Sequence, residues 1–383
     1  MLDRFNAFLF RDDDARGGAG PLAGMTVGVK ANIAVAGMRF HAGLGAWEGR
    51  RAERDAEVVR RLRDAGAAIT GILNMEEAAL GAKTDNPHFG PTHNPHRAGY
   101  SPGGSSGGSG AAVAARLCDV ALGTDTMGSI RIPAAHCGIY GFKPATDRVS
   151  QDGLEPADYA LDAVGPLARD LDTLEQVARV MSDFGEGAIE GAGATLADHG
   201  VELHPDVASA FAAACGALPR PVATASLSSP QSRIRYAGFI QVSKAMADHL
   251  HGVPTSDHLA KLLAYGPRRS TADWTEDQQV LARTAEEIHA LVERNGFLIL
   301  PTVPNAPFPH SEKEPAAQAD FTCLANIAGL PALSLPMGWT GDGLPLGVQI
   351  VGAAGHEAGL FALARHLDDK LRAYRAPQLQ GEP

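Results

Sequence analysis

Two glycine-rich stretches, SPGGSSGGSGAAVAA (101–115) and GTDTMGSIRIPAAHCG (123–138), lie close together in this 383-residue chain. Glycine accounts for 44 of the 383 residues, well above its usual share of about 7%. A glycine-rich loop that leads into a helix lets backbone N–H groups converge on one negative charge. That charge is either a bound phosphate or the oxyanion of an acyl-transfer transition state. The two stretches therefore predict a site.

Two known motifs partly match the first stretch. The phosphate interpretation lacks the GK[ST] ending of a Walker motif, and the nearest GxGxxG-like spacing does not follow a strand. Residues 103–107 (GGSSG) formally match GxSxG, the nucleophile elbow of α/β-hydrolases, which needs a strand directly before its serine. The preceding residues, YSPG (100–103), are typical of a turn instead. The elbow stays open as an alternative, and nucleotide binding is disfavoured.

Composition and charge exclude several classes of partner. The net charge of −11 disfavours nucleic acid and anionic membrane surfaces. Apolar stretches are interrupted well before the roughly 18 residues of a membrane span, and the start (1–14, MLDRFNAFLFRDDD) carries acid where an export signal carries base. The four cysteines are far apart without a CxxC pair, which predicts reduced thiols in a cytoplasmic protein.

Short apolar runs alternate with helical patterns in the first half of the chain. MTVGVK (25–30), AITGIL (68–73) and VALGTD (120–125) are predicted strands. Helices are predicted over 54–65 and from about 108 to 117. Such alternation is typical of an α/β fold, here with a central mixed, largely parallel sheet covered by helices on both faces.

The second half returns to the same rhythm after an irregular segment. A long helix is predicted from about Thr275, which has capping-box spacing to Gln278, to Asn295. Further predicted elements are the strands FLIL (297–300), PALSLP (331–336) and PLGVQIVG (345–352) and a helix over 356–372.

The domain organisation follows from where this rhythm is lost. Residues 185–233 are rich in Gly, Ala, Ser and Pro, which predicts a variable surface excursion over about 185–275. It separates a core of about 20–182 from a distal part of about 276–375. Because no linker divides the chain, we expect a single domain over 1–383.

SPGGSSGGSGAAVAA followed by GTDTMGSIRIPAAHCGIYGFKP (123–144) resembles the signature of the amidase signature family, serine hydrolases that cleave carboxamides with a Ser-Ser-Lys triad. The resemblance extends from about residue 20 to 352, and it is weakest over about 185–320. It implies the fold of that family. It also implies that the catalytic residues are Lys30 in VGVKANIAVAG, Ser105 at the start of SSGG, and Ser129, which follows 24 residues later.

These three side chains suit amide hydrolysis. Ser129 would attack the carbonyl carbon, and Lys30 would take its proton through Ser105. The lysine must then be neutral near pH 7, far below its usual pKa of about 10.4, and its apolar strand predicts the necessary burial. The resemblance further implies a cis peptide before Ser105. Ala31 departs from the family, in which aspartate often follows the lysine.

The resemblance implies roles for other residues as well. The expected oxyanion donors are the backbone N–H groups of Thr126, Met127, Gly128 and Ser129. Met127 stands where the family often has glycine, so its φ should be negative. Expected loop supports are Ser106, Thr124, Asp125, Arg131, Ser150 and Asp162. Met127 and His136 are candidate substrate-pocket residues, with a buried core histidine as the alternative for His136. Trp274 and Phe321 are pocket-wall candidates from their place in the distal half of the chain.

His88, His93 and His96 have a spacing that could suit a metal. Their loop, NPHFGPTHNP (86–95), also carries Asn-Pro and Phe-Gly landmarks of the family, which explain it without metal. We therefore expect no metal and no cofactor.

The function implied is hydrolysis of a small carboxamide to carboxylate and ammonia through an acyl-enzyme. An indole-acetamide-type substrate is the first candidate. The alternatives are hydrolysis of a ureido or biuret-like amide, a catalytically silent chain, and an amidotransferase subunit. A homodimer is left open.

Overall fold

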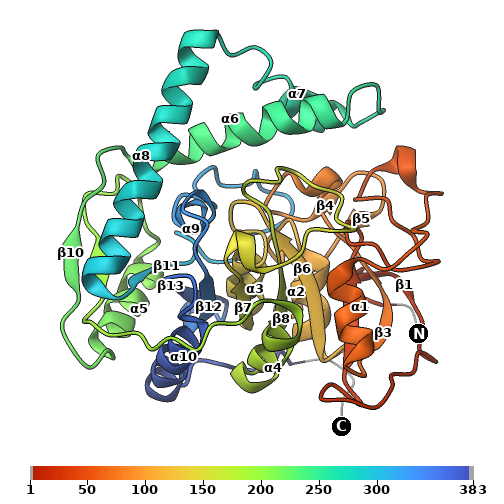
Figure 1. Cartoon of the computed structure of the whole chain (residues 1–383), viewed down its shortest axis with the longest axis horizontal. Helices are drawn as coiled ribbons and strands as arrows, with labels where there is room; N and C mark the ends of the chain where they lie inside the picture. The colour runs from red at the N-terminus through yellow and green to blue at the C-terminus, as the bar shows by residue number, and fades with distance from the viewer. Residues whose placement is uncertain (1–2, 379–383) are drawn as a thin grey trace.

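The structure is a computed structural model that describes residues 3–378, and its central feature is an 11-stranded sheet (Figure 1). The strand order is β1-β3-β2-β6-β8-β7-β12-β13-β11-β9-β10. The strands are β1 (Phe8–Arg11), β2 (Thr26–Lys30), β3 (Ala68–Leu73), β6 (Val120–Asp125), β7 (Tyr140–Lys143), β8 (Ala163–Ala168), β9 (Ala194–Leu196), β10 (Ala223–Ala225), β11 (Leu298–Pro301), β12 (Ala332–Trp339) and β13 (Pro345–Val351). A separate pair is formed by β4 (Asp85–Asn86) and β5 (Gly90–Pro91).

The sheet is mixed, as the sequence predicts. Parallel pairs lie on its two flanks, where β2 pairs with β3 and β6, and β9 pairs with β10 and β11. The pairs in the middle, from β6 to β11, are antiparallel, as is the pair β1 and β3 at one edge. The antiparallel share is therefore larger than expected, and of these described pairs only β12 and β13 are joined by a short turn.

Helices cover both faces of the sheet. One face is covered by α2 and α3, and the other by α1, α4, α5 and α10. Alternation along β6 shows the two sides: Val120 and Leu122 pack in the core with α1 and α4, whereas Ala121 packs with α2 and α3. The helices are α1 (Glu57–Asp64), α2 (Gly107–Ala114), α3 (Arg131–Cys137), α4 (Leu171–Met181), α5 (Pro205–Gly216), α6 (Gln231–His249), α7 (Asp257–Leu263), α8 (Thr271–Asn295), α9 (Cys323–Ile327) and α10 (Glu357–Leu371).

Residues 185–275, expected to form a surface excursion, are instead partly built into the main sheet and its covering helices. β9 and β10 extend the main sheet, and α5 packs on β12. Figure 1 shows α6 and α7 projecting above the sheet as an arm, from which α8 runs back toward β11. The composition concealed α5 because this helix buries only Val207 and Ala214, so its apolar pattern is weak.

Helix α8 begins earlier than predicted. Its N-cap is Ser270, whose side chain accepts a hydrogen bond from the N–H of Asp273. Thr275 lies inside the helix, where its hydroxyl donates to the carbonyl of Thr271. Within residues 3–378 no helix is both long and apolar enough to cross a membrane.

Candidate active site

Lys30 is the last residue of β2, a strand flanked by β3 and β6, and its side chain is fully buried. Its Nζ donates hydrogen bonds to Ser105 Oγ and Thr124 Oγ1, both at 2.7 Å. Burial lowers the pKa of Lys30 to about 7, although the carboxylates of Asp162 and Asp125 act in the opposite direction. A large fraction of this lysine is therefore neutral near pH 7 and can accept a proton.

Ser105 and Ser106 lie just before α2 and are both buried. The peptide bond between Gly104 and Ser105 is cis, as expected. Ser106 donates its hydroxyl to the carbonyl of Thr124 at 3.2 Å and its N–H to the carbonyl of Ser129 at 3.3 Å. These two bonds join the loop of Ser105 to the loop of Ser129.

Thr84, which lies outside the glycine-rich stretch, holds the loop of Ser105 by hydrogen bonds on both sides of the serine. Its hydroxyl donates to the carbonyl of Gly103 at 2.8 Å and accepts from the N–H of Gly107 at 3.0 Å. Thr84 is itself held by Glu76, whose carboxylate accepts from the Thr84 N–H at 2.6 Å. The N–H of Glu76 also donates to the carbonyl of Ser105 at 3.1 Å, so the loop is held on both sides of the serine.

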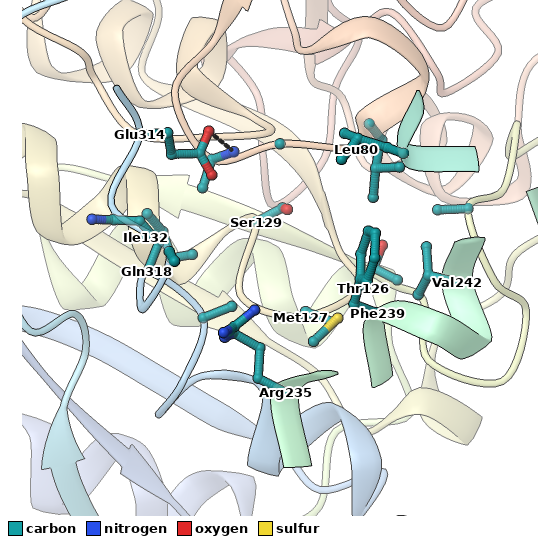
Figure 2. Close-up of a pocket in the computed structure, with 17 residues that line it drawn as sticks. Leu80, Thr126, Met127, Ser129, Ile132, Arg235, Phe239, Val242, Glu314 and Gln318 are labelled. Atoms are coloured by element: carbon teal, nitrogen blue, oxygen red, sulfur yellow. Dashed lines mark hydrogen bonds between the residues drawn. The ribbon is translucent and has the colours of Figure 1, made fainter. Parts of the chain in front are cut away.

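Ser129 lies at the edge of a cavity of about 180 Å³, into which its side chain points (Figure 2). The serine follows the β6 strand and precedes α3, and it is 8% exposed. The side chains and backbone that line the cavity belong to Ala79, Leu80, Gly81, Ala82, Thr126, Met127, Ser129, Ile132, Ala157, Arg235, Phe239, Val242, Leu262, Glu314, Ala316, Gln318 and Ala319.

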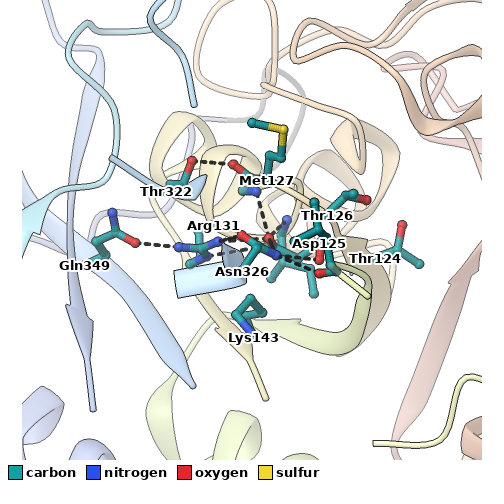
Figure 3. A network of polar contacts seen from close by, with 12 residues as sticks. Thr124, Asp125, Thr126, Met127, Arg131, Lys143, Thr322, Asn326 and Gln349 are labelled. Carbon is teal, nitrogen blue, oxygen red and sulfur yellow. Dashed lines mark hydrogen bonds and ion pairs between the residues drawn. The ribbon is translucent and has the colours of Figure 1, made fainter. Parts of the chain in front are cut away.

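The loop of Ser129 is built around the buried carboxylate of Asp125 (Figure 3). The guanidinium of Arg131 donates to both carboxylate oxygens at 2.9 and 3.0 Å. Further bonds come from the N–H of Gly128 at 2.7 Å, the N–H of Ile130 at 3.2 Å and the side-chain amide of Asn326 at 2.9 Å. Burial alone would raise the pKa of Asp125, but Arg131 outweighs it and holds that pKa at about 2.

The expected set of oxyanion donors needs one correction. The N–H of Gly128 donates to Asp125, so it is not free to bind an oxyanion. The N–H groups of Thr126, Met127 and Ser129 have no hydrogen-bond acceptor among the described residues. These three remain the candidate donors.

Glycine is required at position 128 and helpful at position 238. Gly128 has φ +133°, and a Cβ there would lie 2.2 Å from the hydroxyl oxygen of Thr322, which donates to the Met127 carbonyl. A Cβ at Gly238 on α6 would lie 3.1 Å from Cε of Met127. Met127 is not among the described residues with positive φ, as expected, and its side chain lines the cavity.

A sequence profile of the amidase family matches residues 11–187 and 186–361, which is most of the chain. The chain is a member of the amidase signature family. A glutamyl-tRNA(Gln) amidotransferase subunit from Methanothermobacter thermautotrophicus is 31% identical over 392 residues, covering 91% of this chain and 85% of that protein. Family members act on C–N bonds, so the chain is identified as an amidase-type enzyme.

Solved structures agree with this membership. A crystal structure described as an amidase has a TM-score of 0.86 and 30% identity, and it covers 96% of this chain and 92% of that chain. A glutamyl-tRNA(Gln) amidotransferase subunit from Thermotoga maritima also has a TM-score of 0.86, at 26% identity, over 98% of this chain and 90% of that chain. The amidase signature fold expected from the sequence is therefore confirmed.

Three of the predicted pocket residues of this amidase do not line the cavity. His136 is buried beside Phe308, and burial lowers its pKa to about 3. Phe321 is fully buried against His199. Trp274 lies on α8 near the ammonium of Lys244, outside the cavity lining. For Trp274 and Phe321, position in the distal half of the chain was too coarse a signal, and for His136 the alternative of a core histidine holds.

The residues that do form much of the wall were missed. Arg235, Phe239 and Val242 come from α6, and Glu314 and Gln318 come from the segment before α9. A signal for α6 was present, since small or apolar residues recur every four positions at Ile234, Gly238, Val242 and Met246.

The remaining predicted residues have structural partners. Asp162 accepts a hydrogen bond from the Thr126 hydroxyl at 2.5 Å and so supports the loop, whereas Ser150 accepts only a local bond from the N–H of Asp152. His88 is paired with Glu77, and His96 with the carbonyl of Cys137. Within residues 3–378 no group of His, Cys, Asp or Glu is arranged to hold a metal ion.

Replacing Asp125 by asparagine should destabilise the protein strongly. The change leaves the buried charge of Arg131 without its partner, a situation that costs about 3–5 kcal/mol. Thermal and urea unfolding followed by circular dichroism would measure the loss. Asp172→Asn, which breaks an exposed pair with Arg365, is the matched control and should have a much smaller effect. Equal effects of the two substitutions would contradict the central place of Asp125.

Replacing Lys30 by methionine should change how stability depends on pH. Between pH 7 and about 10.5 the unfolded chain binds a proton at Lys30 that the folded chain lacks, because burial lowers the folded pKa to about 7. The free energy of unfolding of the wild type therefore rises with pH in this window relative to that of Lys30→Met. Urea unfolding at pH 7, 8.5 and 10 measures the difference, with Lys261→Met as the exposed-lysine control. A difference that is flat across this range would show that Lys30 is not a buried, neutral lysine.

Proposed function

We propose that this amidase hydrolyses a small carboxamide to carboxylate and ammonia with Lys30, Ser105 and Ser129 as its catalytic residues. The observation that carries the proposal is the hydrogen bond from the buried Lys30, whose pKa is lowered to about 7, to Ser105 Oγ. A base of this kind replaces the histidine of other serine hydrolases. We also propose a cytoplasmic location, in keeping with the four free cysteines.

The reaction proceeds in two halves. Ser129 Oγ attacks the carbonyl carbon while its proton passes to Ser105, and the proton of Ser105 passes to Lys30 Nζ. The N–H groups of Thr126, Met127 and Ser129 stabilise the oxyanion. Lys30 returns the proton through Ser105 to the departing nitrogen, which leaves as ammonia. Water then attacks the acyl-enzyme by the same route and releases the carboxylate.

The cavity favours a small substrate. Its volume of about 180 Å³ is close to the roughly 150 Å³ of an engineered protein cavity that holds benzene. Apolar side chains from Leu80, Phe239 and Val242 form much of its wall. A compact aliphatic or aryl acyl group fits this space better than the bicyclic ring of an indole-acetamide-type substrate. We keep the indole-acetamide type as an alternative substrate for the same reaction.

A role as an amidotransferase subunit is the second candidate function. It is favoured by the names of the relatives, since the proteins from Methanothermobacter and Thermotoga are both described as subunits of glutamyl-tRNA(Gln) amidotransferase. In that role the chain would release ammonia for a partner protein rather than act alone.

A fluorophosphonate probe should label Ser129. Labelling should be lost in Ser129→Ala and fall at least about 100-fold in rate in Lys30→Ala, because general-base catalysis contributes about 10²- to 10⁴-fold. Peptide mapping by mass spectrometry identifies the labelled residue. Ser228→Ala, which changes an exposed serine, is the control. Labelling of Ser105 instead would favour the elbow alternative.

Ammonia release from a panel of aliphatic, aryl, ureido and acidic amides should identify the substrate class. The panel includes indole-acetamide, a biuret and glutamine. Turnover by the purified chain would support the amidase proposal. A chain that is labelled at Ser129 but hydrolyses no amide would favour the subunit role instead.

The rate of hydrolysis should fall in acid. Protonation of Lys30 removes the base, so kcat/KM should decline about tenfold per pH unit below the pKa of about 7. Initial rates between pH 5 and 9 on the best substrate measure the profile, with circular dichroism to confirm folding at each pH. A rate that is constant from pH 5 to 7 would rule out Lys30 as the base.

A further inference from the structure

We propose that Arg235 selects amide substrates that carry a carboxylate, which it binds at the polar end of the catalytic cavity. The inference rests on the proposed function and names a substrate class for the same site. Arg235 belongs to α6, a helix that the sequence analysis did not connect with the site, and its side chain reaches from the helix toward Met127 (Figure 2).

The guanidinium of Arg235 is held from one side only. Its Nε is paired with Asp320, whose side chain is only 4% exposed. Its Nη1 and Nη2 groups make no hydrogen bond to any other described residue. The side chain is 24% exposed and lines the cavity. Asp320 thus fixes the orientation of the guanidinium. It leaves the NH₂ groups of Nη1 and Nη2 for a ligand, and one N–H of each lies in the parallel geometry that matches a carboxylate.

Gln318 marks the same region of the cavity as polar. It is only 2% exposed, and its Nε2 donates to the side-chain oxygen of Asn305 at 2.6 Å. Its Oε1 is buried and has no hydrogen-bond partner. An amide oxygen accepts hydrogen bonds and cannot bind a carboxylate, so Gln318 contributes polarity to the wall and Arg235 is the group that binds the anion.

A neighbouring hollow adjoins the catalytic cavity. The hollow, of about 530 Å³, shares Leu80, Gly81, Leu262, Glu314 and Ala316 with the catalytic cavity. Burial raises the pKa of Glu76 to about 7 and also raises the pKa of Glu314, and Lys83 pairs with Asp85, so the hollow is not strongly charged. Arg235 does not line the hollow, so its guanidinium can bind a carboxylate only in the catalytic cavity.

The two sides together orient the substrate. In Figure 2, Glu314 and Arg235 lie on opposite sides of Ser129. With the carboxylate of the substrate at Arg235, the scissile amide lies at Ser129 and the departing nitrogen faces the hollow on the side of Glu314. The volume of about 180 Å³ admits a short chain, so the monoamide of a C4 dicarboxylic acid, succinamate, is the test substrate.

The experiment compares succinamate with butyramide, which has a methyl group in place of the carboxylate. The Arg235→Gln variant should lower kcat/KM for succinamate about 10- to 100-fold, mainly through KM, because a hydrogen bond to a charged group is lost. The ratio of kcat/KM for succinamate to kcat/KM for butyramide should fall by at least about tenfold, because butyramide has no carboxylate to lose its partner. Arg283→Gln, which removes an exposed arginine of α8, is the charge-matched control and should leave both values unchanged.

A second variant guards against misfolding. Arg235→Lys keeps a partner for Asp320 but lacks the planar pair of N–H groups, so it should fold and give a smaller loss for succinamate alone. Equal effects of Arg235→Gln on the two amides, or a wild type that prefers butyramide, would overturn the proposal.

A binding measurement distinguishes a failure of this inference from a failure of the proposed function. Calorimetry with Ser129→Ala measures the affinity for succinamate without turnover, and adding Arg235→Gln should weaken it about 10- to 100-fold. If the wild type hydrolyses neither amide but this binding difference is found, the proposed function fails while the role of Arg235 stands. If succinamate does not bind to Ser129→Ala, the role of Arg235 is refuted.

Discussion

The buried ion pair of Asp125 and Arg131 is the interaction on which the site depends. Asp125 ends β6, and Arg131 begins α3. The same guanidinium also reaches Asn326 of α9 and Gln349 of β13, both at 2.7 Å. Removing two charges from water costs several kcal/mol for each ion, so such a pair adds little net stability. Its contribution is geometric, because one carboxylate fixes the loop of Ser129 against segments from the far end of the chain.

Burial also produces the chemistry of the site. A lysine on the surface would be charged at pH 7, whereas burial at the end of β2 lowers the pKa of Lys30 to about 7, so about half of it is neutral at that pH. Lys143 lies in a similar position at the end of β7, where burial and then the charge of Arg131 lower its pKa to about 7. Both lysines can therefore lose or gain a proton near pH 7, whereas Asp125 and Arg131 stay charged and compensate each other.

Local sequence was sufficient for the elements that support the chemistry. The apolar runs before Lys30 and around Asp125 predicted β2 and β6, and the glycine spacing located the loops of Ser105 and Ser129 correctly. The two failures have different causes. The hydrogen bond from the Gly128 N–H to Asp125 is a matter of local geometry that no residue type reveals. The pocket wall is formed where α6 meets the catalytic loop, and that meeting is a tertiary contact.

The residues that perform the chemistry and the residues that select the substrate lie on different parts of the fold. Lys30 and Asp125 lie on central strands, where a change of volume or charge disturbs many packed neighbours. Arg235 and Phe239 lie on α6, which packs mainly against α7, α8 and α9 rather than against the sheet. Substitutions on this arm can therefore change the shape and charge of the cavity without moving the buried lysine. Gly238 illustrates the coupling that remains, since a side chain there would press on Met127 and so on the loop that holds Ser129.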